Sequence, residues 1–148
     1  MDLIFPPYNF KLKTEEDVNY VFDIIRKKWV IVTPEEWIRQ HIIHYLIIEM
    51  KYPASLISVE RGLEMNGLKK RFDVLVYNRN GIPFLLVECK RPDVNLSQQV
   101  MEQVAIYNAV FKTKLLWITN GIEERIVKYN NDRSGYVWID KLPAYSID

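Results

Sequence analysis

Apolar residues recur along the chain in short runs that predict alternating helices and strands. From residue 34 the runs fit a helix, three strands, a second helix and another strand, at 34–51, 56–63, 70–77, 83–90, 98–111 and 114–119. The strands near 72–76 and 84–89 are apolar on both faces, which is typical of a central sheet covered on both sides. The pattern therefore predicts an α/β (α+β) fold, with an αβββαβ core and a central mixed sheet flanked by helices.

Shorter elements are expected on either side of this core. Strands fit three further runs, at 28–32, 123–129 and 136–139. Residues 1–13 look irregular, although the alternation at 10–13 suits a short edge strand. Residues 15–28 carry apolar side chains at helical spacing (Val18, Phe22 and Ile25), which predicts a helix there.

The segment 71–90 reads as a hairpin with charged residues in an otherwise apolar setting. Asn80-Gly81 is a dipeptide that a two-residue turn favours, because both positions need positive φ. If these two residues form the loop, pairing along the strands places Asp73 opposite Glu88. Charged side chains are costly in an apolar sheet, so their convergence indicates a site.

Side chains alternate along a strand, so Lys90 shares a face with Glu88 while Cys89 points the other way. Two carboxylates a strand spacing apart repel each other unless a cation lies between them. Oxygen ligands suit Mg²⁺ or Mn²⁺, which take one or two carboxylates together with waters and a substrate phosphate. Asp73 and Glu88 are therefore candidate metal ligands, and Lys90 could orient a water or stabilise developing negative charge. The alternative is three ordinary surface charges at a strand end.

Composition limits the classes of protein to consider. With 148 residues, of which 49% are hydrophobic, the chain fits one domain with a real core. The net charge of +1 neither supports nor excludes a nucleic-acid partner. A single cysteine allows no intrachain disulfide, and neither a signal-like leader nor a membrane-length apolar run is visible, so we expect a cytoplasmic protein without membrane contact.

Four short motifs in this order resemble a known family. They are Pro34-Glu-Glu-Trp-Ile-Arg39, Glu88-Cys-Lys-Arg-Pro92, Gln103-Val-Ala-Ile-Tyr107 and Ile118-Thr-Asn-Gly121. Together with Asp73 and the predicted element order, they resemble the PD-(D/E)xK nuclease superfamily, and more narrowly the N-terminal endonuclease domain of type I restriction enzyme R subunits. Phe72 stands where the superfamily's name has proline, a position that varies widely. The resemblance covers about residues 28–130.

The resemblance implies a metal-dependent DNA endonuclease that hydrolyses phosphodiester bonds with Mg²⁺ or Mn²⁺. The implied catalytic residues are Asp73, Glu88, Lys90 and Glu35, of which Asp73, Glu88 and Glu35 would hold the metal. Glu35 competes for its role with Glu36. Glu35 lies four residues before Arg39 and shares a helix face with Ile38 and Ile42, whereas Glu36 is explained by a Thr33-x-x-Glu36 capping box with Pro34 in the first turn.

Other candidates have weaker signals. Gln103 and Tyr107 lie one helical turn apart and would support the site, although the same spacing fits an ordinary core stripe. Arg71 and Arg91 flank the cluster and could contact DNA phosphates. Glu60 could face the site, or pair with Arg61 or Lys70. We interpret His41 and His44 as structural, and the four tryptophans (Trp29, Trp37, Trp117 and Trp138) as core residues.

The sequence therefore predicts a single nuclease-like domain over residues 1–148, with its core at about 28–130, an N-terminal extension at 1–27 and a C-terminal strand and tail at 131–148. The expected partners are DNA and other restriction-system subunits, and a homodimer would supply two active sites for a double-strand cut. No Walker-type phosphate loop is visible, so ATP-driven translocation is not expected of this chain. The alternative function is a nucleic-acid-binding or partner-docking module with little catalysis.

Overall fold

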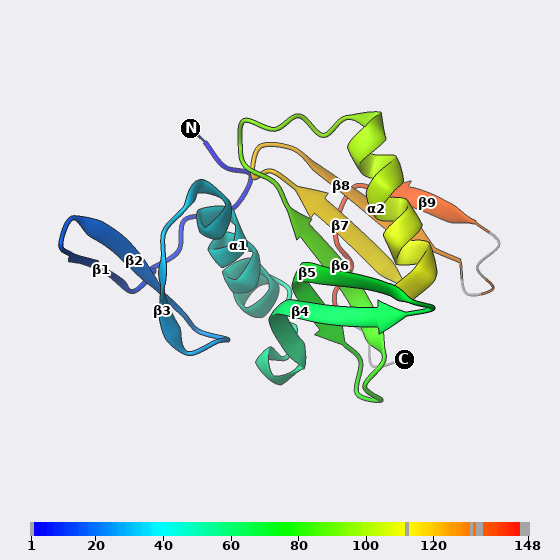
Figure 1. Cartoon of the computed structure of the whole chain (residues 1–148), viewed down its shortest axis with the longest axis horizontal. Helices are drawn as coiled ribbons and strands as arrows, with labels where there is room; N and C mark the ends of the chain where they lie inside the picture. The colour runs from blue at the N-terminus through cyan, green and yellow to red at the C-terminus, as the bar shows by residue number, and fades with distance from the viewer. Residues whose placement is uncertain (1, 112, 131, 133–134, 146–148) are drawn as a thin grey trace.

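The computed structural model describes residues 2–111, 113–130, 132 and 135–145. A small antiparallel sheet comes first, with order β1-β2-β3 and strands β1 (Leu12–Glu15), β2 (Val18–Asp23) and β3 (Lys28–Ile31). A six-stranded sheet forms the body of the molecule, and helix α1 (Pro34–His44) lies between the two sheets (Figure 1).

The large sheet is mixed, as the sequence predicts. Its strands run in the order β4-β5-β6-β7-β8-β9, with only the pair β6–β7 parallel among those described. They are β4 (Ile57–Met65), β5 (Leu68–Tyr77), β6 (Pro83–Cys89), β7 (Leu115–Thr119), β8 (Glu124–Tyr129) and β9 (Tyr136–Ile139). Helix α2 (Gln98–Phe111) makes the crossover between the two parallel strands, so the predicted αβββαβ order is confirmed.

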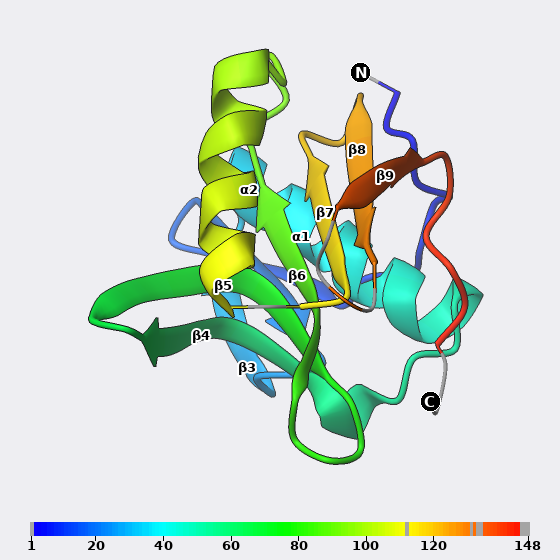
Figure 2. The ribbon, with the colours of Figure 1, turned by 90° about the vertical axis from the view of Figure 1, so that its right-hand side faces the viewer.

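The two helices cover opposite faces of the large sheet (Figure 2). Helix α1 begins at a Thr33 N-cap and is extended by a π-helical turn, η1 (Tyr45–Glu49). A separate short 3-10 turn, η2 (Ala54–Leu56), precedes β4. None of the helices in the described ranges is long and apolar enough to cross a membrane.

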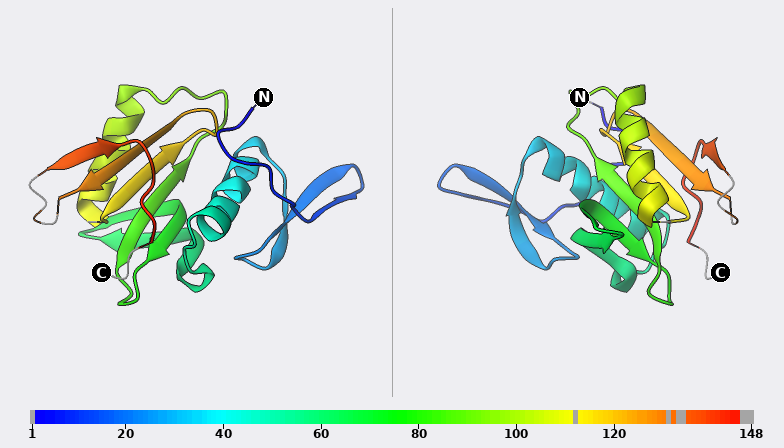
Figure 3. Two further views of the ribbon diagram at one scale, coloured as in Figure 1. Left: turned by 180° about the vertical axis from the view of Figure 1, so that it is seen from behind. Right: turned by 45° about the vertical axis from the view of Figure 1, so that its right-hand side comes forward.

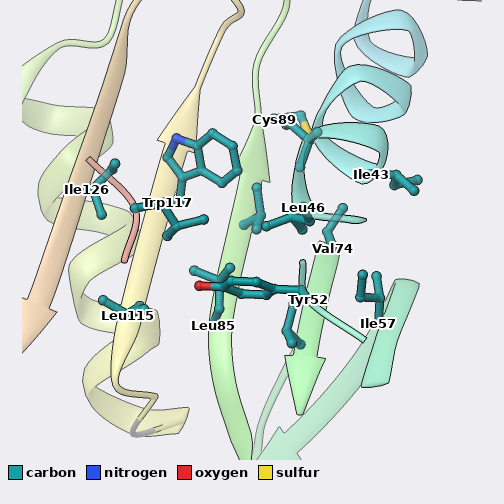
Figure 4. Packing of buried hydrophobic residues seen from close by; sticks show 14 of the residues in the cluster. Ile43, Leu46, Tyr52, Ile57, Val74, Leu85, Cys89, Leu115, Trp117 and Ile126 are labelled. Atoms are coloured by element: carbon teal, nitrogen blue, oxygen red, sulfur yellow. The ribbon is translucent and has the colours of Figure 1, made fainter. Parts of the chain in front are cut away.

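Each helix packs against one face of the sheet and covers a separate hydrophobic cluster. On the α1 side, Leu46, Val74 and Cys89 belong to a cluster that also holds Tyr52 and Trp117, and these side chains meet over the central strands (Figure 4). On the α2 side a second cluster contains Phe72, Leu75, Leu86, Met101, Val104 and Phe111. Strands β5 and β6 contribute to both layers, which explains why their sequences are apolar on both faces.

The helix predicted at 15–28 is wrong, because this segment forms β2, the β2–β3 turn and part of β1 and β3. Val18 and Phe22 are four residues apart, a spacing that also puts two side chains on one face of a strand. Glu16 and Asp17 both have positive φ and make a tight turn between β1 and β2, which a helix could not contain. Figure 3 shows the resulting small sheet on the far side of α1 from the large sheet.

The predicted two-residue loop at Asn80-Gly81 is also wrong, although the register it gave is right. Tyr77 pairs with Pro83, so the loop has five residues, and the pairing shifts between Val76 and Tyr77. The shift compensates for the odd loop length, so Val74 still pairs with Val87. Asp73 and Glu88 follow directly at the next position.

The C-terminal strand lies where it is predicted, but its tryptophan is not buried. Trp117 is in the core, Trp29 and Trp37 are half-buried, and Trp138 on β9 is 50% exposed. Strand β9 is the edge of the sheet and pairs only with β8 among the described strands, which leaves its outer side chains uncovered. Of the predicted tail, residues 131, 133–134 and 146–148 lie outside the described residues.

Candidate active site

The site forms where β5 and β6 pass beneath the first turns of α1. Asp73 and Glu88 occupy the positions directly beyond the Val74–Val87 pair, and their side chains are 14% and 6% exposed. Asp73 Oδ2 accepts a hydrogen bond of 2.7 Å from the backbone N–H of Cys89. The carboxylate is thereby fixed against the strand that carries its partner acid.

Arg39 of α1 fixes the other Asp73 oxygen. Its Nη2 donates to Asp73 Oδ1 at 2.9 Å, and its Nη1 donates to Glu36 Oε1 at 2.9 Å. Although burial opposes its charge, Glu36 and Asp73 raise the pKa of Arg39, so the guanidinium stays ionised. A buried cation and a backbone N–H therefore each bind one oxygen of Asp73.

The two acids at the start of α1 take different places, and Glu35 is the one at the site. Its side chain is 42% exposed and lies 3.7 Å from Arg39 Nη2. Burial raises the pKa of Glu35, and Asp73 raises it further by charge and by a side-chain hydrogen bond. The spacing of four residues explains the Arg39 contact, because such residues lie one turn apart on a helix.

Glu36 is more than a capping residue. Its backbone N–H donates to Thr33 Oγ1 at 3.0 Å, which is the capping bond that the sequence predicts. Its carboxylate, however, is buried between Arg26 and Arg39, with both nitrogen–oxygen distances at 2.8–2.9 Å. The expected role of the Glu36 side chain in a capping box is therefore replaced by a buried ion-pair network.

Glu88 is the most strongly perturbed acid of the site. Burial and the charge of Asp73 raise its pKa to about 7, against the opposing charges of Lys70 and Lys90. Lys70 Nζ lies 3.7 Å from Glu88 Oε1, and this buried oxygen accepts no hydrogen bond within the described residues. A buried acceptor that lacks a donor is a place where a cation would be stabilised.

Lys90 follows the end of β6, where its backbone N–H donates to Thr119 O at 2.8 Å. Its charge lowers the pKa of both Glu35 and Glu88, which places it in the same electrostatic cluster. Cys89 lies in the core cluster on the α1 side, as the predicted alternation requires, and burial raises the pKa of its thiol well above the ordinary value. The thiol is therefore a packing group rather than a nucleophile.

The two α2 candidates differ in their surroundings. The Tyr107 ring lies under Lys70 Nζ at 5.3 Å, and Lys70 in turn contacts Glu88. Tyr107 is therefore linked to the acid cluster through this lysine. Gln103, one turn earlier, has an exposed side chain on α2.

Three flanking charges also have defined places. Arg71 is exposed on β5, and Arg91 pairs with Asp93 at 3.1 Å. Glu60 pairs with Arg26 at 3.2 Å and with Arg39 at 3.6 Å. Of the two alternatives from the sequence, it therefore lies next to the site and does not pair with Arg61 or Lys70. Glu60 has positive φ (54°).

The histidines of α1 are structural in their contacts. His41 Nδ1 lies 2.8 Å from Trp37 O, and His44 Nδ1 lies 2.9 Å from Gln40 O. Both rings pack against Phe10, at 4.8 and 4.6 Å between centroids. Burial lowers the pKa of both, which fits neutral rings in an aromatic cluster.

The donor set can be compared with what a metal ion requires. In the described ranges no group of three or more His, Cys, Asp or Glu side chains is arranged to hold a metal ion. Asp73 and Glu88 still supply two carboxylates, one with a buried oxygen that accepts no hydrogen bond. This pair fits the coordination preference of Mg²⁺, which binds one or two carboxylates and completes its coordination shell with waters and substrate phosphate.

Sequence reasoning missed three cations of the site, Arg26, Arg39 and Lys70. The sequence shows the four-residue spacing of Glu35 and Arg39, but it does not show that Arg39 contacts Asp73. The contact between Lys70 and Glu88 depends on where the two long side chains point, which the β5–β6 register alone does not give. Arg26 lies in the segment 15–28, for which the sequence predicts a helix, so the pattern does not place Arg26 in a turn beside α1.

The chain matches a family sequence model, described as "Type I restriction enzyme R protein N terminus (HSDR_N)", over residues 34–143. This match spans most of the chain and includes the whole acid cluster. The protein belongs to this family. A comparison with curated proteins gave no match.

The fold of this chain is also similar to that of a solved structure. A fragment described as an HsdR subunit of a type I restriction enzyme from Vibrio vulnificus YJ016 superposes with a TM-score of 0.52 at 20% sequence identity. The similarity covers 76% of this chain and 24% of that one. At this identity the likeness concerns the fold, and the chain corresponds to about a quarter of the longer protein.

Proposed function

We propose that this chain is a metal-dependent DNA endonuclease domain of the PD-(D/E)xK type, which hydrolyses phosphodiester bonds. The observation that carries the proposal is the convergence of Asp73, Glu88 and Lys90, with Glu88 buried, raised in pKa to about 7, and lacking a hydrogen bond to Oε1. Perturbed acids next to a specific lysine are typical of functional sites. Membership of the R-protein family supports nuclease chemistry in general.

Asp73 and Glu88 would hold Mg²⁺ or Mn²⁺, with Glu35 at the more exposed side of the site. Such an ion polarises a phosphoryl oxygen and lowers the pKa of a bound water. The chain's own residues prepare this site. Arg39 and the Cys89 N–H orient the two Asp73 oxygens, and the protein fold keeps Glu88 close to Asp73 despite their repulsion.

Lys90 would carry the catalytic positive charge at the strand end. Its ammonium can orient the attacking water or stabilise the negative charge that develops on the phosphate. Tyr107 would hold Lys70 against Glu88, and Gln103 would reach water or DNA from the exposed side of α2. Arg71 and Arg91 would contact DNA phosphates.

Membership of the family supports the biological setting that we propose. DNA is the proposed substrate, the other subunits of a restriction system are the proposed partners, and the cytoplasm is the proposed location. A homodimer would bring two sites to one duplex for a double-strand cut. The similarity covers 24% of the longer solved chain. We therefore also propose that this domain works together with further domains or subunits.

The decisive experiment is cleavage of supercoiled plasmid and single-stranded DNA with Mg²⁺ or Mn²⁺. Lys90→Ala should lower the cleavage rate by about 100-fold or more, since removal of one positioned charge in a catalytic site has this effect. Asp73→Asn should remove metal binding in calorimetry.

Lys128→Ala is the matched control, because Lys128 is an exposed lysine on β8, and it should cut like the wild type. Equal cutting by Lys90→Ala and Lys128→Ala would refute the assigned site. A folded wild type that neither binds metal nor cuts would overturn the nuclease and leave a nucleic-acid-binding module.

A further inference from the structure

One side chain from the small sheet enters the ion network of the candidate site. Arg26 lies in the turn between β2 and β3, and its three guanidinium nitrogens each face a different carboxylate. Nε donates to Asp23 Oδ2 at 2.8 Å, Nη2 to Glu36 Oε1 at 2.8 Å and Nη1 to Glu60 Oε2 at 3.2 Å. The arginine thus joins the small sheet, helix α1 and strand β4.

The turn itself is built to aim this side chain. Asp23 is fully buried, and its Oδ1 accepts from the backbone N–H groups of Ile25 and Arg26 at 2.8 and 2.7 Å. Its Oδ2 also accepts from Gln40 Nε2 of α1 at 2.9 Å. Asp23 therefore holds the backbone of Arg26 next to α1 through contacts that do not involve the guanidinium of Arg26.

Arg26 shares its carboxylate partners with Arg39. Glu36 Oε1 accepts from both arginines, and Glu60 has one oxygen near each of them. Arg39 uses its remaining Nη2 to bind Asp73 Oδ1. A continuous chain of contacts therefore runs from Arg26 through Glu36 and Arg39 to Asp73.

Arg26 supplies one of the two arginine charges that oppose the carboxylates of this network. Three carboxylates, those of Asp23, Glu36 and Glu60, surround Arg26, and two of them also contact Arg39. Without Arg26, Glu36 and Glu60 would be left to Arg39 alone and would draw its guanidinium away from Asp73. Glu36, whose side chain is 9% exposed, would then be a buried charge with one cation fewer, which favours local rearrangement.

We propose that Arg26 is a positioning residue for Asp73, acting through Glu36 and Arg39, and that the small sheet is therefore a working part of the active site. Arg26 precedes the segment matched by the family, which begins at residue 34. The proposal rests on the proposed nuclease function, because the positioning is of value only if Asp73 holds a metal. Groups that orient a metal ligand typically change metal affinity by about 10–100-fold when they are removed.

The test compares Arg26→Ala, Arg26→Lys and the control Lys28→Ala, which removes an exposed lysine two residues away on β3. Mn²⁺ binding is measured by calorimetry, and plasmid cleavage is measured as a function of Mn²⁺ concentration. Arg26→Ala should bind Mn²⁺ about ten-fold more weakly. The Mn²⁺ concentration that gives half-maximal cleavage should rise by the same factor.

Arg26→Lys separates charge from geometry. Lysine keeps the positive charge but has one nitrogen where arginine has a planar fork of three. We therefore expect its Mn²⁺ midpoint to stay shifted by about three-fold or more, between the wild type and Arg26→Ala. If Arg26→Ala does not fold, as judged by circular dichroism, Arg26→Lys alone decides.

Each outcome has a distinct meaning. A merely structural role would lower the folded fraction and the maximal rate, while the Mn²⁺ midpoint of the folded protein stayed at the wild-type value; this result would overturn the positioning role alone. A wild type that neither binds Mn²⁺ nor cuts DNA would overturn both the proposed nuclease and the role of Arg26. A shift with Lys28→Ala equal to that with Arg26→Ala would show a general charge effect and would also overturn the proposal.

Discussion

At the scale of single residues, the least favourable group of the site is the buried carboxylate of Glu88. A carboxylate with 6% of its side chain exposed, next to a second acid, is stable in its ionised form only if a cation offsets the burial. Lys70 and Lys90 oppose the shift but do not cancel it, since the pKa is still raised to about 7. The ionised form of Glu88 therefore lowers the stability of the folded protein, and a bound cation would offset this effect.

The pH dependence of stability follows from this residue. The folded protein keeps the Glu88 proton up to about pH 7, whereas the unfolded chain loses it near 4.5, so the folded state binds more protons in between. Stability should therefore fall as the pH rises through this window in metal-free buffer. Glu88→Gln should abolish cleavage and remove the part of this slope that Glu88 contributes. At pH 8 it should raise the unfolding free energy by about 2–3 kcal/mol.

Urea denaturation at several pH values measures this effect. Glu64→Gln is the control, because the Glu64 side chain is 59% exposed on β4, and it should keep the wild-type slope. A Glu88→Gln protein that is less stable than the wild type at pH 8 would contradict the assignment of a raised pKa.

At the scale of elements, the turn after β7 fixes α1 against the sheet. Gly121 has a φ of +87°, and a Cβ placed on it would lie 2.4 Å from Ile38 Cδ1 of α1. Its carbonyl also accepts a 2.8 Å hydrogen bond from the N–H of Ile4. The glycine thus allows the turn, the N-terminal segment and α1 to meet, and α1 is the element that carries Glu35 and Arg39.

Gly121→Ala should therefore be more damaging than a glycine change at a turn with free space. Gly67→Ala is the matched control, because Gly67 also has positive φ (+81°) but nothing lies within 4 Å of its added Cβ. The control should cost about 1–2 kcal/mol from backbone strain. Gly121→Ala should cost about 1–3 kcal/mol more from the clash.

A double-mutant cycle with Ile38→Val checks the cause, since valine lacks the Cδ1 atom that clashes. Part of the excess cost should be recovered in the Gly121→Ala/Ile38→Val protein, as measured by urea denaturation. Strictly additive effects would rule out the contact with Ile38 as the reason.

At the scale of the whole molecule, the proposed DNA binding rests on a few exposed basic side chains on the segments that carry the acids. Arg71 is exposed on β5, two residues from Asp73, while Arg91 is held by Asp93. The overall net charge of +1 gives little general attraction for DNA. Binding should therefore depend on these local groups.

DNA affinity should fall steeply with salt, and Arg71→Ala should reduce the slope of log K against log salt by about 1. Arg91→Ala should have a smaller effect, because its guanidinium is shared with Asp93. Fluorescence anisotropy with labelled DNA in EDTA measures the slopes. Arg79→Ala is the control at the far end of the same hairpin, and a loss of slope there equal to that of Arg71→Ala would contradict a localised DNA surface.

The sequence by itself determined the core order, the β5–β6 register and the faces of Glu88 and Cys89. The reason is that period-2 alternation and apolar runs are local properties, which a chain carries whatever surrounds it. Only the tertiary structure decided that 15–28 forms strands, since the spacing of Val18 and Phe22 fits both periods. It also decided which cation meets which acid: Arg39 with Asp73, Lys70 with Glu88 and Arg26 with Glu36 join segments far apart in the chain. Such pairs depend on how elements pack, and no spacing along the sequence records that.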